Sequence, residues 1–187
     1  MNVVNKNVLV ANAKSGVPLK VRMYVKEEIV DNEKLSSIIN KRKENVKYMK
    51  GMKLPDNVVA LPDIKDVIED ADLLIFVVPH QYLENVLGEI MKNGNLKEDA
   101  KAISLMKGIK IDNYKLILLS NIIERKLNIE CSALSGSNIA GEVSTENFSE
   151  STIGFDNAQT VEIWQTLFDR TYFKINCIQD KPGVEVN

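Results

Sequence analysis

Three short apolar runs in the sequence each end in residues that could bind a small molecule or transfer a proton. His80 and Tyr82 follow LLIFVVP, Lys107 follows AKAISLM, and a turn from Ser135 to Asn138 follows IECSAL. An imidazole can act as a general acid or base, and an ammonium can stabilise negative charge on a substrate oxygen. The ends of these three runs are therefore the candidate site.

Each of these residues also has a structural explanation. A lone histidine after a strand is more often a hydrogen-bonded structural residue than a catalyst, and Lys107 by itself could be a solvated cap on a strand. Tyr82 could pack at the start of a helix, and Ser-Gly-Ser-Asn could be a turn that caps a helix. Residue types alone leave both explanations open.

The hydrophobic pattern alternates between short strands and helices, which is typical of βαβ units and a parallel sheet. LLIFVVP is the most strand-like segment, because near-continuous Leu, Ile, Phe and Val suits a strand that is buried on both faces. In such a sheet ligands bind beyond the carboxyl ends of the strands, so the three run ends should meet at one rim. Asp63 and Asn157 are predicted helix caps. The predicted strands are 21–25, 57–62, 73–79, 100–108, 129–136, 151–155 and 173–180, and the predicted helices are 35–42, 64–71, 82–92, 114–127 and 159–169.

The composition is that of one globular domain, with 187 residues, 44% hydrophobic and 27% charged. A net charge of −2, with lysines scattered among the acids, gives no reason to expect a nucleic acid or an anionic membrane as partner. No apolar run reaches about 18 residues, and no signal peptide pattern is present. Cys131, Cys177 and a single histidine argue against a metal site or a disulfide framework, and we expect a cytoplasmic protein with reduced thiols.

The dinucleotide-binding fingerprint of a Rossmann domain is missing. No two glycines are separated by a single residue, so GxGxxG does not occur. Residues 1–20 contain one glycine, Gly16, and no strand, glycine turn and helix precede VRMYV. The backbone cradle that a pyrophosphate needs at a helix amino end is therefore not visible. The acidic pair Glu27-Glu28 lies near the expected position of a ribose-binding carboxylate, or else begins a solvated loop.

Six segments together resemble the cofactor domain of the soluble NAD-dependent glycerol-3-phosphate dehydrogenases. VPHQY, SLMKG and GSNIAGEV, in that order, carry most of the specificity. The resemblance implies a Rossmann domain that binds NAD. It also implies an enzyme, usually homodimeric, that transfers a hydride between sn-glycerol 3-phosphate and dihydroxyacetone phosphate. Over roughly residues 20 to 186, the segments are KVRMYVKEE, IINKRKENVKYMKGMKLPDNVVALPD, EDADLLIFVVPHQYLENVL, AISLMKGI, LSGSNIAGEVSTENFSESTIG and FKINCIQD.

The resemblance also implies roles for single residues. Lys107 falls on the family's substrate-contacting lysine, and Asn138 and Ala140 fall in the GxNIA segment, which lies against the cofactor near the substrate. Tyr82 falls where the family usually has a phenylalanine packed against the cofactor, and Lys26 where it often has an aromatic near the adenosine. The implied substrate-binding residues are thus Lys107 and Asn138, and the implied cofactor-binding residues are Tyr82, Ala140 and Lys26. The histidine of VPHQ has a structural role, and no catalytic residue is assigned.

The sequence departs from the family pattern at both ends. The family's GSGNWG loop and the strand before it should precede KVRMYV, and its principal catalytic lysine belongs to a helical second domain beyond Asn187. We expect an atypical segment at 1–19, a partial NAD-binding Rossmann domain at 20–187 and no helical substrate domain. The doubly wound, mostly parallel sheet should lack its first strand and glycine-rich loop. An unpaired inner edge would result, unless residues 3–10 substitute as a strand.

Two functions remain in competition. The first is an NAD-dependent glycerol-3-phosphate dehydrogenase, of which this chain is a cofactor-domain fragment without activity of its own. The second is a non-catalytic remnant that acts only as a binding or interaction module. A third possibility, a Rossmann dehydrogenase for a small hydroxyacid or sugar acid, is disfavoured by GSNIAGEV.

Overall fold

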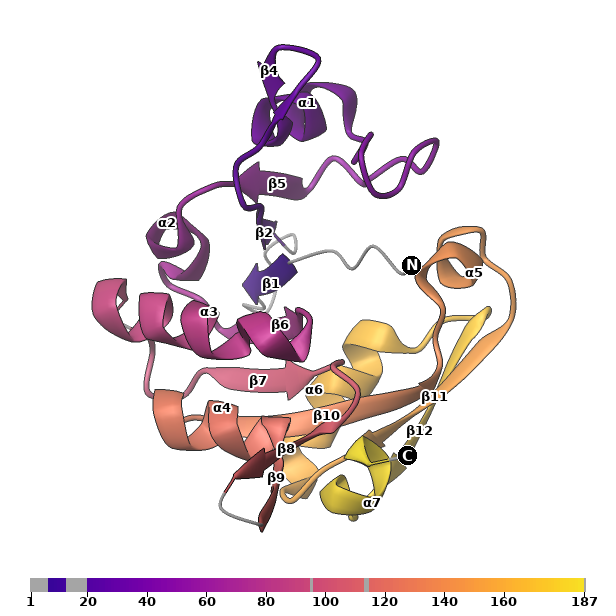
Figure 1. The fold of residues 1–187 in the computed structure, drawn as a ribbon. Coiled ribbons are helices and arrows are strands. Elements are labelled where there is room, and N and C mark those ends of the chain that lie inside the picture. Colours follow the sequence, from indigo (N-terminus) through magenta and orange to yellow (C-terminus); the bar gives the residue numbers. More distant parts are fainter. Residues whose placement is uncertain (1–6, 13–19, 95, 113–114, 187) are drawn as a thin grey trace. The chain divides into compact units, whose positions relative to one another are not determined.

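The computed structural model of the chain describes residues 7–12, 20–94, 96–112 and 115–186. The chain divides into two compact units, unit 1 (Met1–Ala100) and unit 2 (Lys101–Asn187). In the described residues, each unit combines paired strands with helices and one short two-stranded hairpin (Figure 1).

The main strands of unit 1 pair in the order β6-β1-β2-β5. β2 and β5 are parallel, whereas β1 is antiparallel to both β2 and β6, so β2, β5 and β6 run in the same direction. The strand predicted at 73–79 is confirmed as β6, and four of its five residues are buried. The strands are β1 (Asn7–Asn12), β2 (Lys20–Tyr24), β5 (Val58–Leu61) and β6 (Leu73–Val77), with the hairpin β3 (Ile29–Val30) and β4 (Glu33–Lys34) after β2.

β1 fills the position between β2 and β6 that the sequence predicts to be empty. Leu9 of β1 lies opposite Met23 of β2 and opposite Ile75 of β6. The expected unpaired inner edge is therefore wrong, and the substitute strand is β1, while residues 3–6 of the predicted substitute lie outside the described residues. The reversed direction follows from chain length. Only residues 13–19 separate β1 from β2, whereas a parallel crossover takes about a dozen residues or more.

The helices of unit 1 are α1 (Leu35–Arg42), α2 (Ile64–Ile68) and α3 (His80–Asn93). Asp63 caps α2 as predicted, because its carboxylate accepts a hydrogen bond from the Lys65 backbone N–H at 2.9 Å. α3 buries one apolar stripe at helical spacing. α1 contributes two residues to a core cluster with β2, β5 and the residue after β2. That cluster consists of Met23, Val25, Leu35, Ile39, Val58 and Ala60.

The main strands of unit 2 pair in the order β12-β11-β10-β7. β7 and β10 are parallel, β11 and β12 are parallel to each other, and β10 and β11 are antiparallel. The parallel pairing of β7 with β10 puts their carboxyl ends at the same edge. These strands are β7 (Lys101–Ser104), β10 (Glu130–Ser137), β11 (Ser149–Gly154) and β12 (Phe173–Ile178).

Unit 2 also contains a hairpin that the sequence pattern hides. β8 (Ile109–Asp112) and β9 (Lys115–Leu118) are antiparallel, and α4 (Leu119–Leu127) begins directly after β9. The helix predicted at 114–127 is therefore wrong over 115–118 and confirmed over 119–127. The run KLILL fits a strand as well as a helix, and pairing with β8 decides for the strand.

Three further helices complete unit 2: α5 (Ala140–Ser144), α6 (Ala158–Phe168) and α7 (Lys181–Glu185). Asn157 caps α6 as predicted, since its side-chain oxygen accepts from the Gln159 N–H at 3.0 Å. Trp164 of α6 has no exposed surface. Helices lie between the strands along the chain in both units. Three of the four main strands of unit 1 run in the same direction, and in unit 2 β7 is parallel to β10 and β11 is parallel to β12, which confirms the predicted α/β class.

Candidate substrate and cofactor site

Lys107 stands just beyond the carboxyl end of β7. Met106 before it is buried, and its backbone N–H donates to Ser104 Oγ at 3.3 Å. Gly108 after it has a φ of +109°, a backbone conformation that favours glycine. The exposed Lys107 side chain donates from Nζ to the Gly136 carbonyl oxygen at 3.0 Å. The lysine thus reaches from the end of β7 to the end of β10, which a simple solvated cap would not do.

Gly136 is required where Lys107 meets it. Its φ is +149°, and a Cβ there would lie 2.7 Å from the Glu150 carbonyl oxygen and 2.7 Å from Ser151 Cα. The β11 backbone therefore passes too close for any side chain at this position. The carbonyl that accepts from Lys107 is held in place by this close strand pairing.

The positive charge of the Lys107 ammonium is not neutralised by an ion pair within the described part of unit 2. The ammonium donates a hydrogen bond to a neutral carbonyl, and no carboxylate among the described residues of unit 2 forms an ion pair with it. A cation beside backbone groups at a strand end can hydrogen-bond an anionic ligand or stabilise charge on a developing oxyanion. The corner formed by the ends of β7 and β10 can therefore bind negative charge.

Two other predicted site residues lie in the segment that Lys107 contacts. Asn138 is half-buried two residues beyond Gly136, and Ala140 is exposed as the first residue of α5. Lys107 and Asn138 thus follow the carboxyl ends of two adjacent parallel strands. Their roles toward a substrate stay predictions.

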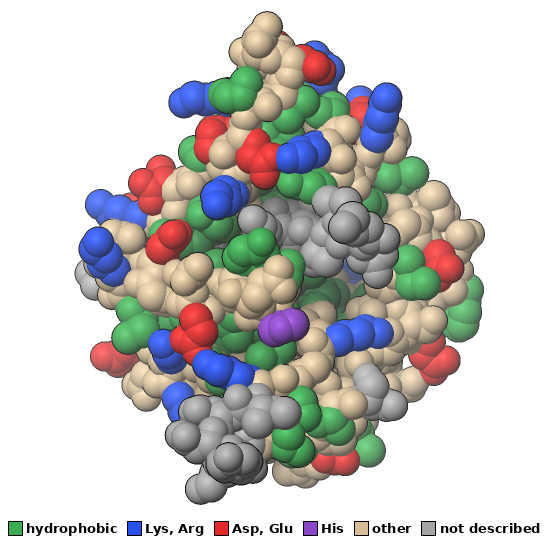
Figure 2. Space-filling view, in the orientation of Figure 1, with side chains coloured by type: hydrophobic (Ala, Val, Ile, Leu, Met, Phe, Trp, Pro, Cys, Tyr) green, Lys and Arg blue, Asp and Glu red, His purple; other side chains and the backbone are tan. Residues whose placement is uncertain are grey.

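The remaining predicted residues belong to unit 1. Tyr82 is half-buried in the first turn of α3, where its backbone N–H donates to the Pro79 carbonyl at 2.8 Å. Lys26 is exposed just beyond β2. His80 is also exposed and is the purple side chain in Figure 2. The convergence of Tyr82 with Lys107 and Asn138 at one rim remains a prediction.

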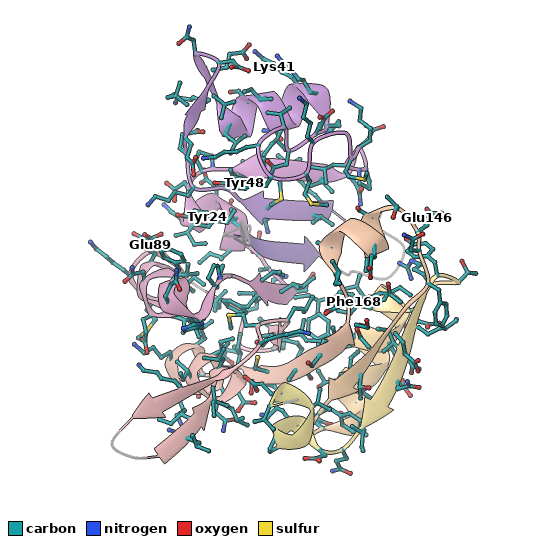
Figure 3. The ribbon with its side chains drawn as sticks, turned by 45° about the vertical axis from the view of Figure 1, so that its right-hand side comes forward. Tyr24, Lys41, Tyr48, Glu89, Glu146 and Phe168 are labelled. Carbon is teal, nitrogen blue, oxygen red and sulfur yellow. The ribbon has the colours of Figure 1, made fainter. Side chains whose placement is uncertain are left out.

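The acidic pair after β2 has structural partners. The Glu27 carboxylate accepts from the Ser36 backbone N–H at 3.3 Å and from its hydroxyl at 2.7 Å, at the start of α1. Glu28 forms an ion pair with Lys47, and the Tyr48 hydroxyl donates to it at 3.1 Å (Tyr48 is labelled in Figure 3). The hydrogen bond that Lys47 donates to Glu28, followed by that with Tyr48, raises the pKa of Lys47. Both carboxylates therefore organise the chain after β2, and a role toward a ribose stays a prediction.

The described residues do not fit the pyrophosphate of NAD at the place where a Rossmann domain holds it. That place is a glycine turn between a first parallel strand and the amino end of a helix. Here β1 is antiparallel to β2 and β6, and only residues 13–19 lead from β1 to β2. The exit of β1 therefore does not enter a helix at the carboxyl edge of β2.

A buried polar cluster around α7 is not visible from the sequence. Lys181 is 3% exposed, and its Nζ lies 2.8 Å from Glu124 Oε1 and 2.6 Å from Asp156 Oδ2. Glu185, also buried, accepts from the Ser120 N–H at 2.9 Å and from the Ser120 hydroxyl. These residues are far apart in sequence and individually resemble solvated charges, so no local signal predicts them.

Burial and hydrogen bonding act in opposite directions in this cluster. Burial disfavours the charged form of Lys181, but hydrogen bonds to Asp156 and Glu124 outweigh it and raise the pKa of the lysine. Burial raises the pKa of Glu185, against the lowering effect of the hydrogen bonds from Ser120. Burial, with Glu124 nearby, also raises the pKa of the Cys131 thiol well above its usual range. The cluster attaches α7 to α4 and to the segment after β11.

No group of three His, Cys, Asp or Glu side chains in the described ranges is placed to hold a metal ion. None of the described helices has both the length and the apolar character needed to cross a bilayer. Figure 2 shows acidic and basic side chains interspersed on the visible face.

Comparison with known proteins identifies the family. Residues 5–161 match the protein family described as the NAD-dependent glycerol-3-phosphate dehydrogenase N-terminus. The cytoplasmic glycerol-3-phosphate dehydrogenase (NAD+) of Drosophila melanogaster is 45% identical over 168 residues, covering 89% of this chain and 46% of the relative. Among relatives with this name, one from Arabidopsis thaliana is chloroplastic and 41% identical.

Solved structures agree with this match. A structure of glycerol-3-phosphate dehydrogenase from Plasmodium falciparum is 51% identical with a TM-score of 0.84, over 89% of this chain and 45% of that one. Glycerol-3-phosphate dehydrogenase from Saccharomyces cerevisiae is 37% identical with a TM-score of 0.82, over 88% of this chain and 49% of that one. The chain spans about half the length of the relatives it matches.

These matches confirm the Rossmann-like fold class and the resemblance inferred from VPHQY, SLMKG and GSNIAGEV. They confirm NAD as the cofactor of the family. The matched region begins at residue 5 and so includes most of the segment predicted to be atypical. The chain belongs to the family of NAD-dependent glycerol-3-phosphate dehydrogenases and matches its amino-terminal part.

Proposed function

We propose that this chain is a cofactor-domain part of a glycerol-3-phosphate dehydrogenase, which transfers a hydride between sn-glycerol 3-phosphate and dihydroxyacetone phosphate. The observation that carries this proposal is the Lys107 ammonium on the Gly136 carbonyl, with no carboxylate paired to it in the described part of unit 2. Both substrates are phosphate esters with an oxygen at the reacting carbon. A preorganised cation suits that oxygen, because charge develops on it during reduction.

In this proposal the residues divide into two groups. Lys107 and Asn138 contact the substrate, with the lysine donating a hydrogen bond to the reacting oxygen. Tyr82, Ala140 and Lys26 contact NAD. No proton donor is assigned among the residues of this chain, and a cytoplasmic location is proposed by analogy with the Drosophila relatives.

We further propose that these 187 residues do not turn over substrate by themselves. Correct placement of the reacting groups supplies ~7–11 kcal/mol of a typical barrier. The reversed β1 leaves the pyrophosphate without its usual anchor, so the reacting ring would not be held over the Lys107 corner. The same feature supports the second candidate function, a binding or interaction module without catalysis.

The first test uses the chain itself. Turnover is followed as the loss of NADH absorbance after NADH and dihydroxyacetone phosphate are added to the chain. Binding is measured separately, by titrating the chain into NADH and following the fluorescence of NADH. We expect no turnover above that of Lys107→Ala and no saturable NADH binding. Turnover that is lost in Lys107→Ala and kept in Lys92→Ala, an exposed lysine of α3, would overturn the inactivity while supporting the family function.

The second test isolates the Lys107 corner. Residues 101–187 replace the equivalent segment of the P. falciparum glycerol-3-phosphate dehydrogenase, which is 51% identical to this chain. We expect the hybrid enzyme to be active and Lys107→Ala to lower kcat/KM about 10²–10³-fold, as for loss of one oxyanion donor. Lys174→Ala, at an exposed ion pair on β12, is the control. The emission of Trp164 as a buried tryptophan shows that the hybrid is folded. A folded hybrid whose kcat/KM does not change in Lys107→Ala would refute the assignment.

A further inference from the structure

β5 is the end strand of the unit 1 sheet, and one of its edges faces away from β2. The carbonyl oxygens of Asn57 and Leu61 accept hydrogen bonds from the β2 side, at 3.1 and 2.9 Å. The backbone N–H and C=O groups of successive strand residues face alternately toward one neighbouring strand and toward the other. The N–H and C=O groups of Val58 and Ala60 therefore face away from β2. An open edge of this kind is a template on which another strand can add.

Asn40, near the end of α1, pairs with the outward groups of Ala60. The Ala60 N–H donates to Asn40 Oδ1 at 2.8 Å, and Asn40 Nδ2 donates to the Ala60 carbonyl at 2.8 Å. A side-chain amide offers one donor and one acceptor side by side, as a peptide group does. Asn40 therefore takes the place of one residue of a neighbouring strand.

Lys43 and two prolines complete the same edge. Lys43 ends α1 in a left-handed conformation, with φ 50° and ψ 44°, and its Nζ donates to the Val58 carbonyl at 2.9 Å and to the Asp56 carbonyl at 3.0 Å. The Val58 N–H donates to the Pro55 carbonyl at 3.1 Å. The next outward position is Pro62, which has no N–H to offer.

We propose that Asn40 and Lys43 form an edge lock, which prevents another strand from pairing with β5. The strand excluded is above all β5 of a second copy, because VVAL is uncharged and half β-branched, a composition that favours strand-to-strand pairing. All four outward backbone groups of Val58 and Ala60 have a partner within the chain, so the edge has nothing to offer a second strand. The polar loop at 43–56 (KENVKYMKGMKLPD) contributes Lys43 and Pro55 to the closure of this edge.

The experiment compares Asn40→Leu with Asn93→Leu in the whole chain. Asn93 is the matched control, because it is exposed near the end of α3 and its Nδ2 donates to one backbone carbonyl, that of Glu89, at 3.0 Å. Hydrogen exchange at the Ala60 amide should accelerate about tenfold in Asn40→Leu, since Asn40 is its acceptor, and should not change in Asn93→Leu. Sedimentation over a concentration series should show association of Asn40→Leu alone.

A labelled peptide of residues 56–62 (DNVVALP) probes the edge directly. We expect it to bind Asn40→Leu and not the parent chain. Val67→Ala separates edge opening from lost stability, because Val67 is a fully buried residue of α2 with no part in the β5 edge. Under conditions where all variants are folded, Val67→Ala should neither associate nor bind the peptide.

A second variant covers the case in which Asn40→Leu does not fold. Lys43→Met removes the donor to Val58 and Asp56. Its control is Lys41→Met, because Lys41 is an exposed lysine of α1 that pairs with Glu33 of β4 (Lys41 is labelled in Figure 3). Association of Lys43→Met but not Lys41→Met supports the edge lock. Unchanged Ala60 exchange in Asn40→Leu, or equal association of Val67→Ala, overturns it.

Discussion

The buried Lys181 should contribute far more to stability than an exposed lysine with a similar ion pair. Breaking a buried ion pair costs roughly 3–5 kcal/mol, because the remaining charge stays without a partner. Here the carboxylate side chains of Glu124 and Asp156 are 28% and 61% exposed, so water recovers part of their solvation. We therefore expect Lys181→Met to lower the free energy of unfolding of unit 2 by about 2 kcal/mol.

Tryptophan fluorescence measures this effect in unit 2. Trp164 is the sole tryptophan and is fully buried, with its ring stacked 6.2 Å from that of Phe168. With a urea slope of about 2 kcal/mol/M, Lys181→Met should lower the urea midpoint by about 1 M. The control is Lys174→Met, whose lysine pairs with Asp169 at 3.3 Å with 48% and 38% of the side chains exposed.

The control variant should shift the midpoint by less than about 0.5 M, because exposed ion pairs contribute roughly 0–1 kcal/mol. A double variant with Glu124→Gln should show a coupling energy, since both side chains belong to one network. Equal midpoints for Lys181→Met and Lys174→Met would refute the claim that the cluster holds α7 in place.

Three further outcomes can be measured in the same way. Glu185 has a raised pKa in the folded chain, so its protonated form contributes stability that is present below the ordinary glutamate pKa and lost as pH rises through the raised value. Glu185→Gln should therefore show a smaller fall in unfolding free energy over that interval, and an identical pH profile would contradict the assignment. Gly154→Ala should cost about 2 kcal/mol, because its Cβ would lie 2.7 Å from Lys181 Cα, and unchanged urea midpoints would show that α7 gives way freely. Gly136→Ala should destabilise unit 2 by about 2 kcal/mol through its φ of +149°, whereas Gly88→Ala in α3, with nothing within 4 Å of the added Cβ, should be neutral or stabilising by circular dichroism.

Features set by local chemistry could be predicted from the sequence. β6 is a continuous apolar run, and Asp63 and Asn157 accept hydrogen bonds from N–H groups two residues ahead, so the signal and the structure occupy the same few residues. The family motifs likewise put Lys107 at a strand end, and its contact with Gly136 follows from the parallel pairing of β7 with β10.

Features set by partners far along the chain could not. The strand character of 115–118 depends on β8, since the same letters suit a helix. Asn40 lies in a helix, and no sequence motif around it predicts a contact with a strand. Its role depends on Ala60, 20 residues away. In the sequence, Lys181 and Glu185 resemble exposed charged residues. Their burial depends on contacts with Glu124 and Ser120 of α4, which lie 57 and 65 residues earlier in the chain.

The reversed β1 changes the order in which unit 1 can assemble. A first strand that runs parallel to its neighbour must wait for a crossover, whereas an antiparallel neighbour separated by residues 13–19 can pair as a hairpin within about 1–10 μs. The pairing of β1 with β6, in which Leu9 lies opposite Ile75, joins distant parts of the chain. It therefore has the larger entropic cost of loop closure. During synthesis, the β1–β2 pair can therefore form once residue 24 has emerged, and it then offers β6 a ready-made edge on which to dock.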